Sequence, residues 1–245
     1  DIVMQNDFGN AKSTNAKMIP VIDISGAISG DGLDGVADAI YNAAINHGFF
    51  YISNHGIDPV LMEQAFAVSK AFFELPEVDK QAIAVDRNQR GWLAQGMSRM
   101  QGSKTYDLKE VFFWGPHTEA DDMDVRACKP LCAVNQWPRD FPRLYEDLIP
   151  YYDAVCQIAR HVMAAVAVSL DQPANFFDKA YAKPLARGQM VYYPASTPQD
   201  DAEARFGVAP HTDFGVLTVL LQDSSGGLQV RAKSGDWIEA PPIPG

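Results

Sequence analysis

The sequence is poor in the residues that build disulfide frameworks and cysteine-rich zinc sites. It holds three cysteines among 245 residues, an odd number that cannot all pair within one chain. Cys128 and Cys132 are separated by three residues, whereas structural zinc sites favour a gap of about two. Because disulfides are rare in reducing compartments, reduced thiols in a cytoplasmic protein are the expected state.

Positive charge and long hydrophobic runs are also scarce. The chain carries 20 Lys and Arg against 31 Asp and Glu, which gives a formal charge of −11 and argues against nucleic acid as a partner. The longest apolar run, Val162–Leu170, is about half the length that a bilayer span requires, so no membrane association is expected. Residues 1–18 lack the apolar core of a secretory signal and are expected to form a disordered arm.

The first part of the chain alternates short strands with helices. Ile19–Ser25 reads as a strand, and Phe49–Gly56 reads as a second, buried one. Apolar residues from Leu33 to Ala44 recur at helical spacing, and Gly48 stands where a left-handed residue ends a helix. The pair Asp58-Pro59 supplies the start of another helix.

The second part of the chain is richer in strands. A long helix is predicted from Phe141 to Leu170, with Pro150 inside it. The strand-like KEVFFWG precedes this helix, and four short strands follow it: RGQMVYYP, GVLTVLLQ, GGLQVRA and DWIEAPP. Helices first and short strands last predict an α+β protein whose second half is an antiparallel sandwich or jelly roll.

The stretch APHTDFG places His211 and Asp213 one residue apart. In an extended strand, residues i and i+2 point to the same side, so both side chains can reach one ion. Imidazole and carboxylate suit Fe(II), Mn(II) or Zn(II), and a further histidine would complete the facial triad of non-haem iron oxygenases. The same motif is also compatible with a polar cap on a strand.

Longer motifs place the chain beside a known family. The second half contains GVAPHTDFGVLTVLLQDSSGGLQV and GDWIEAPPIPG, and the first half contains IPVIDIS, GFFYISNHGI, FFELP and KEVFFWG. These stretches resemble the 2-oxoglutarate/Fe(II)-dependent dioxygenases of the isopenicillin N synthase-like group. The resemblance runs from Ile19 to Gly245. It implies a double-stranded β-helix (jelly-roll) core with an N-terminal helical elaboration and a long supporting helix. Residues 19–140 would form the N-terminal region of this family and residues 141–245 the iron-binding region, within one compact structural unit.

The resemblance also implies roles for individual residues. His211 and Asp213 would be two of three iron ligands. Tyr193, the second tyrosine of VYYP, would donate a hydrogen bond to the distal carboxylate of 2-oxoglutarate; a tyrosine that fills the core is the alternative interpretation. Phe214 is a candidate substrate contact or a packing residue.

The family pattern further requires a second histidine, and an arginine with a serine that bind the keto acid. These would follow Gly245, so we expect the sequence to continue beyond that residue. Among the other histidines, capping or packing roles are expected for His47 and His55, and a surface or packing role for His161, which leaves His117 as the remaining substitute ligand.

The implied activity is oxidative decarboxylation of 2-oxoglutarate coupled to hydroxylation, or a related oxidation, of a small-molecule substrate, with Fe(II) as cofactor, 2-oxoglutarate as cosubstrate and O2 as oxidant. Two alternatives remain open. One is an oxidase of the same group that works without 2-oxoglutarate, and the other is a non-catalytic jelly-roll binding protein with an incomplete metal site. The substrate and the oligomeric state are left open by the sequence.

Overall fold

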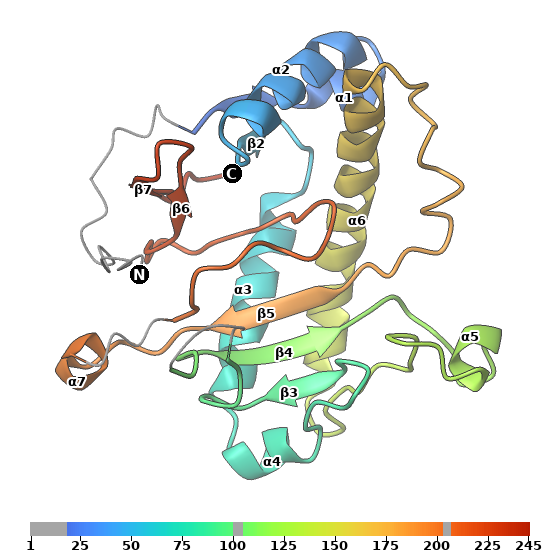
Figure 1. Cartoon of the computed structure of the whole chain (residues 1–245). Coiled ribbons are helices and arrows are strands. Elements are labelled where there is room, and N and C mark those ends of the chain that lie inside the picture. The colour runs from blue at the N-terminus through green and yellow to red at the C-terminus, as the bar shows by residue number, and fades with distance from the viewer. Residues whose placement is uncertain (1–18, 100–104, 203–206) are drawn as a thin grey trace, which may run out of the picture. The chain divides into compact units, whose positions relative to one another are not determined.

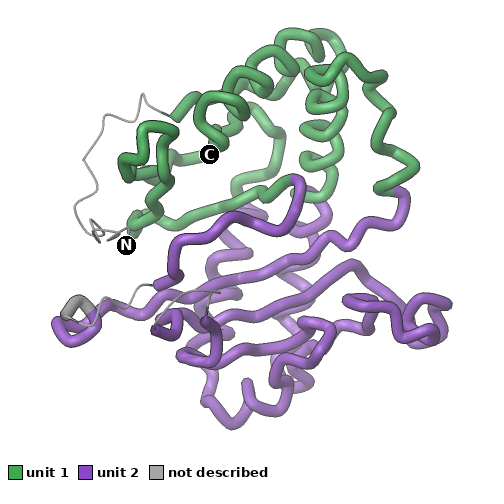
Figure 2. Tube along the Cα trace, viewed as in Figure 1, with its two compact units in different colours: residues 1–59, 155–181, 217–245 green, residues 60–154, 182–216 purple. Residues whose placement is uncertain are grey.

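The computed structural model describes residues 19–99, 105–202 and 207–245; the arm expected over residues 1–18 lies outside them. Within this part the chain forms two compact units (Figure 2). Unit 1 comprises residues up to Pro59 together with residues 155–181 and 217–245, and unit 2 comprises residues 60–154 and 182–216. The expected α+β class is confirmed, because both helices and strands are present (Figure 1).

Unit 1 begins with a parallel strand pair joined through helices. Strand β1 (Val21–Asp23) pairs with β2 (Tyr51–Ser53), and α1 (Ser25–Ser29) and α2 (Leu33–Asn46) lie between them in sequence. Helix α2 ends as predicted: Gly48 has a φ of +74°, and its N–H donates to the Ala43 carbonyl over 3.1 Å.

The main core of unit 1 lies between α2 and the C-terminal part of α6 (Arg143–Ser169). Helix α2 buries the apolar face that its spacing predicts, because those side chains exclude water against their neighbours. The buried residues that the two helices contribute to this core are Val36, Ala37, Ile40, Ala43, Ile158, Val162 and Ala165.

A second, smaller core in unit 1 surrounds the hairpin of β6 (Gln229–Arg231) and β7 (Trp237–Glu239). The chain after β7 contains three prolines among its last five residues, and these cannot donate backbone hydrogen bonds to a ladder. Side chains bind its carbonyls instead. The Tyr51 hydroxyl donates to the Pro241 carbonyl over 2.7 Å, and His55 Nε2 lies 3.0 Å from the Gly245 carbonyl oxygen.

Unit 2 contains an antiparallel sheet in the order β3 (Gly91–Leu93), β4 (Glu110–Trp114) and β5 (Gly188–Tyr192) (Figure 1). Helix α3 (Pro59–Phe73), begun by the predicted proline, and the first turns of α6 pack on one face of this sheet. Three short helices complete the described part of the unit: α4 (Glu77–Gln81), α5 (Met123–Arg126) and α7 (Pro198–Ala202).

The register of this sheet decides which side chains face the helices. Phe112 pairs with Met190, and both are buried in the core with α3 and α6. Tyr192 also lies on this face, where its ring stacks on Phe73 of α3 with centroids 5.6 Å apart. The strand ends at Tyr192, and Tyr193 follows it directly.

The prediction of a strand over GVLTVLLQ is wrong. In the structure this stretch is irregular, and Phe214, Val216 and Leu220 are exposed. No strand of the described residues pairs with it, and a strand forms only where a neighbouring strand completes its ladder. None of the helices in the described ranges is both long and apolar enough to cross a bilayer.

Candidate active site

His211 and Asp213 come together although they do not lie in a strand. His211 Nε2 is 3.4 Å from Asp213 Oδ1, and the two side chains are 35% and 52% exposed, so both are accessible to a ligand. The strand geometry from which their convergence was predicted is absent, because residues 209–213 are irregular. The local chain path nevertheless brings the two side chains to one point.

The hydrogen bonds of the His211 ring determine what its two nitrogens can do. Nδ1 lies 2.9 Å from the Ala209 carbonyl oxygen, which can only accept, so Nδ1 carries the proton. In the neutral ring Nε2 is then an acceptor that faces a carboxylate oxygen. A proton on Nε2 would make this contact an ion pair, and a divalent metal bound by both atoms would equally satisfy it. Across the described residues, no group of three or more His, Cys, Asp and Glu side chains is arranged to hold a metal.

Tyr193 follows β5 directly and is 50% exposed, so it is not a buried core aromatic. Its ring lies against the backbone of Gly207, where a Cβ atom would come within 2.6 Å of Cδ1 of the tyrosine. Partial burial, and then the negative charge of Asp107, raise the pKa of Tyr193. The hydroxyl therefore stays protonated at neutral pH and can donate a hydrogen bond.

Asp107 is a polar residue of this region that the sequence did not single out. Its side chain is 1% exposed, and Oδ1 accepts a hydrogen bond from the backbone N–H of Ala209 over 3.1 Å. This carboxylate therefore contacts the chain two residues before His211. No local spacing indicates the bond, because the two residues are 102 positions apart in the sequence.

Arg187 is a second residue that the sequence did not single out. Its guanidinium lies over the ring of Phe113, 5.3 Å from the centroid, and donates to Oε1 of Gln89. Partial burial lowers the pKa of Arg187, and the charge of Asp213 opposes that shift. A cation therefore lies within electrostatic range of the His211 and Asp213 pair.

The histidine that remained as a substitute ligand lies elsewhere in unit 2. His117 Nε2 is 2.8 Å from Glu119 Oε1, and both side chains are about 70% exposed. This pair belongs to a loop near α5 and is a local contact between residues two apart in the sequence. It therefore provides a useful comparison for the His211 and Asp213 pair.

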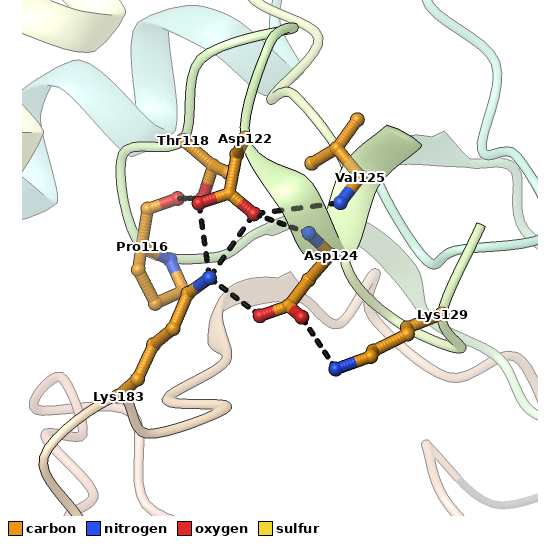
Figure 3. Close-up of polar contacts among 7 residues, drawn as sticks. All are labelled: Pro116, Thr118, Asp122, Asp124, Val125, Lys129 and Lys183. Atoms are coloured by element: carbon orange, nitrogen blue, oxygen red, sulfur yellow. Dashed lines mark hydrogen bonds and ion pairs between the residues drawn. The ribbon is translucent and has the colours of Figure 1, made fainter. Parts of the chain in front are cut away.

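A larger group of charges surrounds α5 (Figure 3). Lys183 Nζ lies 2.9 Å from Asp122 Oδ2 and also contacts Asp124, which in turn contacts Lys129. The Asp122 carboxylate additionally accepts from the N–H groups of the first turn of α5 and caps that helix. Two lysines balance two aspartates, so this cluster is an ion-pair network that ties α5 to the chain after α6.

Two family descriptions match the chain. Residues 19–140 match the family described as the N-terminal region of the non-haem dioxygenase in morphine synthesis. Residues 187–245 match the 2OG-Fe(II) oxygenase superfamily. The second match includes Tyr193, His211 and Asp213.

Curated relatives give the same result. A 2-oxoglutarate-Fe(II) type oxidoreductase of Aspergillus fumigatus is 34% identical over 212 residues, which cover 84% of this chain and 63% of that protein. The 2-oxoglutarate-Fe(II) type oxidoreductase hxnY of Emericella nidulans is 32% identical over 237 residues, which cover 92% of this chain and 67% of that protein. The chain thus spans about two thirds of the length of these relatives.

Solved structures with the same fold carry relevant ligands. A full-length protein of Neurospora crassa, solved in complex with alpha-KG, has a TM-score of 0.78 at 29% identity, covering 92% of this chain and 70% of that one. The same Neurospora protein with alpha-KG and thymine has a TM-score of 0.77 and covers 92% of this chain and 71% of that one.

Proposed function

The chain belongs to the family of 2-oxoglutarate- and Fe(II)-dependent oxygenases, and we propose that it takes part in the oxidation of a small molecule coupled to decarboxylation of 2-oxoglutarate. The family expected from the sequence motifs is confirmed, and with it the family's cofactors, Fe(II), 2-oxoglutarate and O2. The domain division at residue 140, a jelly-roll core and a cytoplasmic location stay predictions. Similarity to structures of this family at TM-scores near 0.78 supports the jelly roll.

The facing acceptors of His211 and Asp213 are the observation that carries this proposal. His211 Nε2 and Asp213 Oδ1, 3.4 Å apart, would be two ligands of Fe(II). Bound iron would supply the activation of O2. The protein's own contribution is to orient the imidazole through its Nδ1–H bond to Ala209 and to present the Asp213 carboxylate beside it.

Tyr193 would hold the distal carboxylate of 2-oxoglutarate. Its hydroxyl, whose pKa is raised, keeps its proton at neutral pH, which is what a donor to a carboxylate requires. A hydrogen bond to a charged group contributes roughly 1.5–3 kcal/mol, enough to orient a small keto acid. The substrate class is proposed as a small molecule because the Neurospora crassa protein, a structural neighbour, is solved with thymine.

An anaerobic metal titration tests the proposal. Fe(II) with 2-oxoglutarate should produce the visible charge-transfer band of a chelate on this chain, and His211→Ala or Asp213→Ala should abolish it. His117→Ala is the matched control, because it also removes a histidine paired with a carboxylate. A band that survives both site variants, or that is lost equally in the control, would refute the assignment of these residues.

Product analysis separates the proposed activity from an oxidase that works without 2-oxoglutarate. Under the proposal, succinate forms in proportion to the O2 consumed, and both depend on added 2-oxoglutarate. Oxygen consumption without succinate would instead support the 2-oxoglutarate-independent oxidase.

A further inference from the structure

Asp107 is a buried carboxylate whose polar partners fall into two groups. Its side chain is 1% exposed, so its charge must be compensated within the protein. At Oδ2, Lys109 Nζ lies 3.2 Å away and Ser98 Oγ donates over 3.1 Å. At Oδ1, the backbone N–H of Ala209 donates over 3.1 Å. One oxygen thus receives the charge compensation, and the other binds the chain that leads to His211.

Ala209 is bonded on both sides of its Cα atom. Its N–H donates to Asp107, and its carbonyl accepts from Nδ1–H of His211 over 2.9 Å. The intervening Pro210 has a fixed φ and no N–H, and it also restricts Ala209 to an extended conformation. The tripeptide from Ala209 to His211 is therefore stiff, and its position depends on the bond at its start.

The direction of these hydrogen bonds determines which ring nitrogen of His211 has a free lone pair that can bind a metal. An imidazole that donates from Nδ1 presents its lone pair at Nε2, and Nε2 is the atom that faces Asp213 Oδ1 at 3.4 Å. If Ala209 moved, its carbonyl would leave Nδ1, and the proton would be free to move to Nε2. A protonated Nε2 cannot bind a metal.

We propose that Asp107 is a positioning residue for the metal ligand His211: by fixing the peptide of Ala209, it holds the His211 ring in the Nδ1–H tautomer with Nε2 directed at the metal position. This inference rests on the proposed function in that it assigns the metal to His211. Residues that orient a ligand in this way typically change metal affinity by about 10- to 100-fold when they are replaced.

The direct test is the tautomer of His211 in the metal-free protein. Long-range proton–nitrogen correlation spectra of 15N-histidine-labelled protein, recorded at a pH at which the imidazoles are neutral, distinguish Nδ1–H from Nε2–H. The His211 signal is identified by its loss in His211→Gln. We expect the Nδ1–H form in the wild-type protein, and a shift toward Nε2–H, the form that an unconstrained histidine side chain favours, in Asp107→Ala.

A second variant guards against misfolding caused by an unpaired buried lysine. The double variant with Asp107→Leu and Lys109→Met removes both charges at once. Proteins often tolerate replacement of both members of a buried ion pair by apolar residues. The matched control is Glu110→Gln. Glu110 is also a partly buried carboxylate paired with a lysine, Lys80, but its other bond goes to the Trp92 indole rather than to the segment from Ala209 to Asp213.

Metal affinity supplies the second readout, with Mn(II) as a redox-stable substitute for Fe(II). Titrations followed by electron paramagnetic resonance should show a dissociation constant about 10- to 100-fold higher in the Asp107 variants, and within about twofold of wild type in Glu110→Gln. A wild-type His211 in the Nε2–H form, an unchanged tautomer in the Asp107 variants, or an equal change in Glu110→Gln would each overturn the inference. If the protein bound no Mn(II) at all, the proposed function would fail, while the tautomer spectra would still decide the role of Asp107.

Discussion

Lys80 and Glu110 form a buried ion pair in unit 2, with 2.6 Å between Nζ and Oε1 and side chains only 7% and 13% exposed. The Lys80 ammonium also donates to the Phe73 carbonyl, and the same Glu110 oxygen accepts from the indole of Trp92. The pair therefore links α4, β4 and β3. Each charge compensates the other, so removing either residue alone would leave an uncompensated buried charge.

We predict that Lys80→Met destabilises the protein by about 3–5 kcal/mol, because it leaves the Glu110 carboxylate buried without a cation. Replacing both residues, with Glu110→Leu added, should recover part of this loss, since no uncompensated charge remains but the Trp92 indole loses its acceptor. The free energy of unfolding from denaturant titrations of the single and double variants measures the coupling. Additive losses would contradict a coupled pair.

Gly207→Ala should disturb Tyr193. The new Cβ atom would lie 2.6 Å from Cδ1 of the tyrosine ring, so the ring must move. Under the proposed role of Tyr193, binding of 2-oxoglutarate should weaken about tenfold in Gly207→Ala, as in Tyr193→Phe, because each change would remove the hydroxyl from the position proposed for the carboxylate.

Gly35→Ala is the control for this substitution. Gly35 lies within α2, and a Cβ atom at this position would meet no neighbouring residue within 4 Å. The change should therefore stabilise the helix by up to about 1 kcal/mol without affecting 2-oxoglutarate binding. Isothermal titration with 2-oxoglutarate and Mn(II) compares the two variants. Equal binding in Gly207→Ala and wild type would show that the Tyr193 ring position does not matter.

The alkaline stability of the protein should depend on Tyr151 of α6. Burial raises the pKa of Tyr151 to about 12, from an ordinary value of 10.0. Between these pH values the folded state holds a proton that the unfolded chain has lost, so the free energy of unfolding falls as the pH rises from about 10 to about 12.

Tyr151→Phe removes this ionisation and should reduce the alkaline loss of stability by about 2 kcal/mol. Denaturant titrations at several pH values between about 9 and about 12 measure the difference from wild type. Tyr41→Phe is the control, because Tyr41 is 45% exposed. If the pH dependence of Tyr151→Phe matched that of wild type, burial of this phenol would not be its cause.

The ion-pair network around α5 should act locally (Figure 3). Lys183→Met removes the cation that joins Asp122 to Asp124, so hydrogen exchange in the α5 segment should accelerate, while the exposed network changes global stability little. Added salt should produce a similar but smaller effect in the wild-type protein. Lys179→Met, at another exposed lysine, should leave the exchange of α5 unchanged.

Acid should weaken the same network. Hydrogen bonds from Lys129 and then Lys183 lower the pKa of Asp124 to about 2, below its ordinary 3.8. A carboxylate with a lowered folded pKa stabilises the fold above its ordinary pKa and loses this contribution as the pH falls through the folded value. Protection of the α5 amides, relative to their intrinsic exchange rates, should therefore persist at about pH 4 and decrease toward about pH 2, and Asp124→Asn should reduce that dependence.

Local patterns predicted the elements that depend on nearby residues. The spacing of Val36, Ile40 and Ala43 indicated the buried face of α2, and Gly48 indicated its end, because helix formation and termination are decided within a few residues. The short pattern His-x-Asp likewise identified a pair of side chains that do meet, 3.4 Å apart.

Contacts between distant residues were decided by the tertiary structure. GVLTVLLQ has the composition of a strand, but strand formation needs a partner, and none of the described strands pairs with it. The bond from Asp107 to Ala209, across 102 positions, likewise has no local signal, because a buried carboxylate is satisfied by whichever donor the fold brings to it. The sequence by itself determined the family, the three long helices α2, α3 and α6 and the His211 and Asp213 pair, whereas the contacts around His211 came only from the packing of the chain.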